Sequence, residues 1–197
     1  MMNVLRFTVL CSALAAAGCG GDDVDSDEAA RAAYIGLDGA VEKALGLGMD
    51  GFNAATSANI PPQMTTGDVT GTLTVSGQVD SGASDNKEMR LLLDLAEYRD
   101  EVPGSDLVVR YDTMEAAQPM LDISLRGLPS ATFTGTLTGT FYMEGDIEGA
   151  VNLSLTLEGM TEPNPDATDN IRRVVGTTHV TGTATSSYGT FNVDVTI

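Results

Sequence analysis

From about residue 67 to residue 197, apolar and polar side chains alternate along the chain with a period of two. This alternation constrains the fold more than any other feature, because it gives an extended strand one apolar face and one polar face. The alternating segments predict about eight long strands. They lie at about 69–79, 89–95, 107–111, 121–125, 132–141, 147–157, 174–184 and 191–197.

Short turn signals rich in Gly, Pro, Asp and Asn separate these segments, as at Asp80-Ser81-Gly82 and Glu144-Gly145-Asp146. Connections this short join antiparallel neighbours. Glycines recur inside the strands on the apolar face, where they permit tight coiling. We therefore expect a mainly β fold, an antiparallel meander that forms a curved sheet or a barrel-like shape.

Before this region, residues 29–52 have apolar side chains at steps of three and four, which predicts one N-terminal amphipathic helix. Small residues also recur every fourth position from Ala32 through Gly36 to Gly48. Such a row is known from helices that self-associate in membranes. We favour the other explanation, a helix that packs closely into a curved sheet, because the segment carries too many charges to span a bilayer.

These patterns divide the chain into five parts. We expect residues 1–18 to be a signal peptide, for which the residues are given below, 19–28 an acidic tether, 29–52 the helix, 53–66 a linker and 67–197 the antiparallel β domain.

The segment Ala16-Ala17-Gly18-Cys19 follows a short apolar run with one preceding charge, Arg6. It resembles the lipobox of bacterial lipoproteins, with Ala16 where that family has Leu. Two ordinary signal-peptidase sites, Ala13-Leu14-Ala15 and Ala15-Ala16-Ala17, leave simple secretion as an alternative. Cys11 is a weaker lipidation candidate, because no small residue precedes it.

The resemblance implies that Cys19 carries a diacylglycerol thioether and an N-terminal acyl chain, so that the membrane is a partner through this anchor. Gly20 stands where some bacteria place an Asp as an inner-membrane retention signal, and by this analogy we expect the outer membrane. Since Cys11 would be removed with the signal, no structural disulfide is expected.

The formal net charge of −18 argues against a nucleic-acid partner, because duplex binding depends on Lys and Arg that meet phosphates. We found no phosphate-binding glycine loop, nucleophile elbow or zinc motif, and we expect no cofactor.

His179 is the only histidine and falls on the polar face of its strand, so we interpret it as a solvated residue rather than a catalytic one. Two acidic segments resemble calcium loops only in spacing. Asp23, Asp25 and Asp27 form one, and Asn164, Asp166 and Thr168 form the other. Both lack the central Gly and the terminal Glu, so we predict no metal site there, and no enzyme.

Three functional hypotheses follow. The first is a non-catalytic cell-envelope lipoprotein with a structural or interaction role. The second is a carrier that holds an apolar small ligand in a β-barrel pocket. The third is an outer-membrane β-barrel, in which the apolar face of the strands would meet lipid.

Overall fold

A computed structural model describes residues 26–167 and 170–197, and it shows one helix and an antiparallel sheet of ten strands. The helix is α1 (Ser26–Ala54), and a short 3-10 turn, η1 (Glu115–Ala117), lies between two strands. The strands are β1 (Asn59–Thr66), β2 (Thr70–Val79), β3 (Lys87–Arg99), β4 (Val109–Asp112), β5 (Met120–Arg126), β6 (Thr132–Gly145), β7 (Gly149–Pro163), β8 (Ile171–Arg173), β9 (His179–Ser186) and β10 (Gly189–Thr196).

The main path of the sheet runs β1-β2-β3-β4-β6-β7-β9-β10, with every neighbour antiparallel. At two positions in the sheet, two strands lie one after the other beside the same neighbouring strand. Both β4 and β5 lie between β3 and β6, and the segment with η1 separates them. In the same way, β8 and β9 both pair with β7. The predicted antiparallel, curved, mainly β fold with one helix is confirmed.

The alternation also assigns the two faces of the sheet. The apolar residues of each strand point to the concave side, where Leu73, Leu93, Leu137 and Leu153 are buried in one continuous core. The polar residues point to the convex side, and the Thr-rich stretches of β2, β6 and β9 supply much of that surface.

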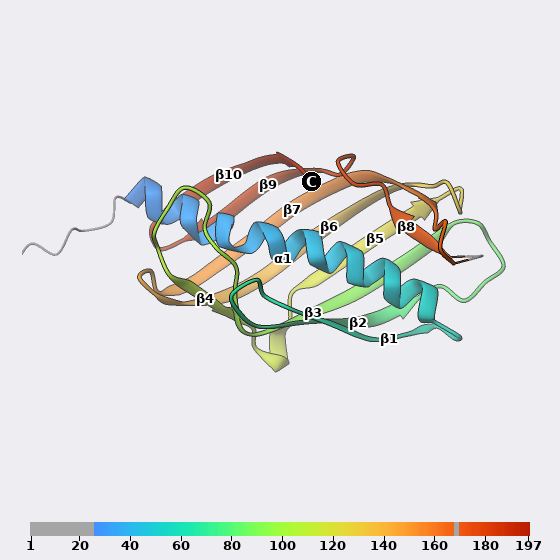
Figure 1. Cartoon of the computed structure of the whole chain (residues 1–197), viewed down its shortest axis with the longest axis horizontal. Coiled ribbons are helices and arrows are strands. Elements are labelled where there is room, and N and C mark those ends of the chain that lie inside the picture. The colour runs from blue at the N-terminus through green and yellow to red at the C-terminus, as the bar shows by residue number, and fades with distance from the viewer. Residues whose placement is uncertain (1–25, 168–169) are drawn as a thin grey trace, which may run out of the picture.

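Helix α1 lies along the concave side of the sheet, with β10 on one flank and β1 on the other (Figure 1). Its side chains are covered almost all round, and from Ala29 to Met49 none is fully exposed. Leu37 and Leu45 are wholly buried, and burial of each contributes about 1.5–3 kcal/mol. The helix is therefore the centre of the core rather than a surface element.

The small residues of α1 stand where the helix crosses the sheet. A Cβ added at Gly36 would lie 2.5 Å from Tyr111 Oη, and one added at Gly39 would collide with Asp100 Oδ2. A Cβ at Gly48 would lie 2.7 Å from a methyl group of Leu91. Close packing against a curved sheet thus accounts for these glycines without any membrane partner.

The structure differs from the sequence prediction at three places. The expected linker 53–66 contains the last two residues of α1 and all of β1, which includes Pro61 and Pro62. The predicted strand 174–184 begins only at His179, because β8 ends at Arg173 and a turn follows. The helix also extends beyond the predicted 29–52 at both ends.

Candidate functional site

A cluster of ionisable side chains joins α1 to the β2–β3 side of the sheet. Lys43 Nζ lies 2.8 Å from Asp68 Oδ1 and 2.9 Å from Asp100 Oδ1. Tyr98 Oη donates a hydrogen bond of 2.5 Å to Asp100 Oδ2 and lies 3.2 Å from Lys43 Nζ. The Asp68 backbone N–H donates to Asp100 Oδ1 at 2.7 Å. We call these four residues, Lys43, Asp68, Tyr98 and Asp100, the Lys43 cluster.

Burial differs strongly within the Lys43 cluster. The Asp100 side chain is 6% exposed and the Lys43 side chain 24%, whereas that of Asp68 is 69% exposed. A buried carboxylate needs both a cation and hydrogen bonds to be tolerated. Asp100 has both, because Lys43 supplies the cation while Tyr98 and the Asp68 backbone supply the hydrogen bonds.

The pKa shifts in this cluster oppose acid–base catalysis near neutral pH. Burial acts to lower the pKa of Lys43, but the hydrogen bonds and charges of Asp68 and Asp100 outweigh it and raise that pKa above its ordinary 10.5. Burial, followed by the hydrogen bond and charge of Asp100, raises the pKa of Tyr98 above its ordinary 10.0. The ammonium and the phenol therefore keep their protons, and neither is a base or a nucleophile.

Other polar contacts fasten α1 along its length. Arg173 from β8, whose side chain is 8% exposed, pairs with Glu42 at 2.5 Å and donates to Thr178 at 3.2 Å. Asn53 exchanges two hydrogen bonds with the Ile171 backbone, of 2.7 and 3.0 Å. Because Glu42 and Lys43 are adjacent, the middle of the helix is ion-paired to both flanks of the sheet.

Every buried side-chain nitrogen or oxygen in the part of the chain that the structure describes has a hydrogen-bond partner. Over the same residues, no group of three or more His, Cys, Asp or Glu side chains is placed to hold a metal ion. The buried polar groups of the described residues are thus satisfied by hydrogen bonds within the chain. The Lys43 cluster links α1 to the sheet.

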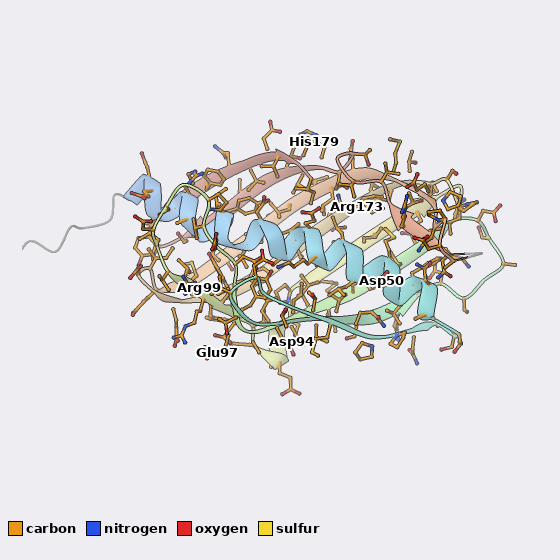
Figure 2. The ribbon with its side chains drawn as sticks, in the orientation of Figure 1. Asp50, Asp94, Glu97, Arg99, Arg173 and His179 are labelled. Atoms are coloured by element: carbon orange, nitrogen blue, oxygen red, sulfur yellow. The ribbon has the colours of Figure 1, made fainter. Side chains whose placement is uncertain are left out.

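His179 lies on the convex face of β9, where its Nε2 is 2.7 Å from Asp194 Oδ1 of β10. Its side chain is 52% exposed and that of Asp194 80%. Figure 2 shows His179 and Arg173 on one side of α1 and Asp94 and Glu97 on the other, so the labelled ionisable residues do not converge. The sequence interpretation placed His179 on the polar face, as observed, but missed its partner.

The two segments with calcium-like spacing lie only partly within the described residues. Asn164 Oδ1 accepts a hydrogen bond of 3.0 Å from the Asp166 backbone N–H, and the Asn164 backbone N–H donates to Asn170 at 2.8 Å, so this loop is a polar turn. Thr168, Asp23 and Asp25 fall outside the described range, while Asp27 lies in the first turn of α1.

Cys19 and Cys11 also fall outside the described residues, together with the signal peptide and the tether up to residue 25. The lipid anchor at Cys19 therefore stays a prediction.

The carrier hypothesis depends on the concave side of the sheet. There Leu73, Phe133 and Leu153 are buried and Phe191 stacks on Tyr34 of α1 with ring centroids 5.8 Å apart. The hollows of the described residues include one of about 250 Å³ at the end of α1 and one of about 490 Å³ on the convex face beside Leu92. Both are at the surface, and α1 fills the space between the two flanks of the sheet.

The sequence prediction missed the Lys43 cluster because its members come from α1 and from two separate points of the β region. No local pattern connects Lys43 to Asp68 or Asp100. The only sequence signal for Lys43 is that it is one of the two lysines of the chain.

Among the described residues, no helix has the length and apolar character needed to cross a membrane. Comparison of the chain with protein-family models, with curated proteins and with solved structures finds no match.

Proposed function

We propose that this chain is a cell-envelope lipoprotein, anchored in the outer membrane through Cys19, whose folded part has a non-catalytic structural or interaction role. The observation that supports this most is the position of α1. The helix occupies the concave side of the sheet, the place where a barrel of this size holds a ligand or an active site.

The chemistry of the described residues supports the same proposal. In the Lys43 cluster, Lys43 and Tyr98 keep their protons at neutral pH, and the buried polar atoms of the cluster have hydrogen-bond partners within the chain. His179, the only histidine, pairs with one exposed carboxylate on an open surface rather than in a cleft. Catalytic groups usually lie in clefts, and a general acid or base needs a pKa near neutrality. The raised pKa values of Lys43 and Tyr98 do not meet the second condition, and the exposed position of His179 does not meet the first.

The position of the helix relative to Cys19 bears on how the anchor would work. Seven residue steps separate Cys19 from Ser26, where α1 begins. A fully extended chain of that length spans at most about 25 Å. The folded part would therefore stay close to the bilayer, with the start of α1 nearest to it.

The alternative is a carrier for an apolar ligand, which needs a cavity of a few hundred Å³. To provide one, α1 would have to leave the sheet, and this would break the Lys43 cluster, the Arg173–Glu42 pair and the Asn53–Ile171 bonds together. The packed concave side thus favours the structural or interaction role.

Substitution of the predicted anchor tests the proposal. We expect Cys19→Ser to abolish labelling with a radioactive fatty acid and to move the protein from the membrane fraction to the soluble fraction, because two or three acyl chains hold a protein firmly to a bilayer. Cys11→Ser is the matched control and should change neither result. A Cys19→Ser protein that still incorporates label and partitions with membranes contradicts the proposal.

A further inference from the structure

The two edges of the sheet differ in their capacity to pair with another strand. On β1, Pro61 and Pro62 lack backbone N–H groups, and the register to β2 is irregular between Ile60 and Gln63. Proline and a bulge are the usual means by which proteins block an exposed edge. The β1 edge is therefore closed to regular strand addition.

The β10 edge carries none of these protections. All eight residues from Gly189 to Thr196 keep a regular register with β9, and the strand contains neither Pro nor Lys. Among the residues that the structure describes, no strand pairs with its outer side. The single charged residue is Asp194, which is held by His179 of the neighbouring strand.

The hydrogen bonds at the end of β10 show which of its backbone groups face outward. The Ile197 backbone N–H donates to Thr178 at 2.9 Å, and the Thr178 N–H donates to Ile197 at 3.1 Å, so Ile197 directs both of its groups toward the β9 side. Residues alternate in this respect along an antiparallel strand. Thr190, Asn192, Asp194 and Thr196 therefore direct their N–H and C=O groups to the open edge.

We propose that the β10 edge pairs with β10 of a second copy of this chain, in an antiparallel two-fold dimer with Val193 opposite its own counterpart. A two-fold axis perpendicular to the sheet keeps both concave faces on the same side. Residues that pair across the two strands must point to the same side of the sheet, and with this axis that is possible only if one residue lies opposite its own copy. With Val193 there, Thr190 pairs with Thr196 of the second copy and Asn192 with Asp194. All four outward-directed residues of each copy then have partners.

The neighbouring registers are less favourable. If Asp194 lies on the axis, two carboxylates face each other directly, and like charges opposite one another destabilise a strand pair. If Asn192 lies on the axis, Thr196 loses its partner within β10. The Val193 register also places Phe191 opposite Val195, an aromatic and β-branched pair of the kind that stabilises sheets.

The difference between the edges also sets the size of the assembly. Two open edges would allow a chain to add copies without limit, whereas one open edge gives a closed pair. Since β1 is blocked, the association stops at a dimer. The inference does not depend on the lipid anchor, so failure of the Cys19 test would leave it intact.

A proline substitution tests the edge. The N–H of Asn192 points outward and bonds nothing in β9, so Asn192→Pro should leave the monomer folded while it removes a dimer contact. We expect the chain, purified from its host in mild detergent, to show twice the mass of the single chain by native mass spectrometry. Asn192→Pro should be monomeric, and Asn192→Ala, which keeps the N–H, should be dimeric. A monomeric parent chain, or a dimeric Asn192→Pro, overturns the proposal.

A charge pair tests the register without touching the backbone. Thr190 and Thr196 are exposed, and each faces the other only across the dimer. Thr190→Lys with Thr196→Lys places like charges opposite each other twice and should raise the dimer Kd roughly tenfold. Thr190→Lys with Thr196→Glu places opposite charges there and should dimerise at least as well as the parent chain. Equal Kd values for the two double variants overturn the proposed pairing.

Discussion

At the scale of single residues, Lys43 determines whether the charge of a buried carboxylate is compensated. Its ammonium is the cation for Asp100, the most deeply buried charged side chain of the described residues, and it also lies 5.4 Å from the centre of the Tyr98 ring. Loss of one partner from a buried pair costs more than the pair contributes, because an uncompensated charge stays behind.

Lys43→Met should therefore lower the free energy of unfolding by about 3 kcal/mol. The measurement is urea denaturation followed by circular dichroism. Lys87→Met is the matched control, because Lys87 bonds only backbone carbonyls in an exposed turn and its removal should cost at most about 0.5 kcal/mol. Equal losses for the two variants would show that the Lys43 cluster does not hold the helix.

At the scale of elements, α1 combines poor helix formers with a central position. Its glycines lower the intrinsic helix propensity, each by up to about 1 kcal/mol relative to Ala. Gly36 and Gly39 offset this loss because they let Tyr111 and Asp100 approach the helix closely. At Gly46, by contrast, no atom lies within 4 Å of an added Cβ. The same substitution should thus have opposite effects at different positions of one helix.

Gly46→Ala should raise the free energy of unfolding by about 0.5–1 kcal/mol, because it gains helix propensity without a clash. Gly39→Ala should lower it by about 1–3 kcal/mol, because the methyl group displaces Asp100 from Lys43 and Tyr98. Thermal and urea unfolding of both variants measure these values. Stabilisation by Gly39→Ala would contradict the close approach that we describe.

The sequence predicted these elements unequally, for physical reasons. A period of two is imposed by the pleat, so the sequence could assign Leu73, Phe133 and Leu153 to one apolar face. It left open whether that face turns inward or toward lipid, and the structure shows it buried. The charges of α1 indicated a solvent-exposed face, but Glu42 and Lys43 are ion-paired to the sheet instead. Such pairing depends on segments far apart in the chain, which no local pattern encodes.

At the scale of the whole molecule, three phenols are buried in one core. Burial raises the pKa of Tyr34, Tyr98 and Tyr111 above the ordinary 10.0, and the charge of Asp38 adds to this at Tyr34. Below pH 10 the folded and unfolded chains both keep these protons. Above it, the unfolded chain releases them and the folded chain does not, so stability falls as pH rises. Lys43, with a raised pKa, adds to the loss above its ordinary 10.5.

We therefore expect the free energy of unfolding to be nearly constant from about pH 8 to about pH 9.5 and to fall above about pH 10. The slope should approach about 1.4 kcal/mol per pH unit for each group that ionises only on unfolding. Urea titrations across this range, with phenolate absorbance, measure it. Tyr98→Phe removes one such group and should reduce the slope by about 1.4 kcal/mol per pH unit. A stability that is unchanged at about pH 11 would contradict the burial of these phenols.

The stacking of Tyr34 on Phe191 joins the helix at the start of the described chain to its last strand. This contact has a kinetic consequence. The helix is synthesised before every strand, yet its apolar surface is fully covered only when β9 and β10 have been added to the sheet. Folds dominated by such distant pairings form slowly, because the entropy of closing long loops is lost before the distant contacts stabilise the chain. We expect a chain that lacks β9 and β10 to expose the part of the concave face that these strands cover, so that this stage of folding is the one most prone to aggregation.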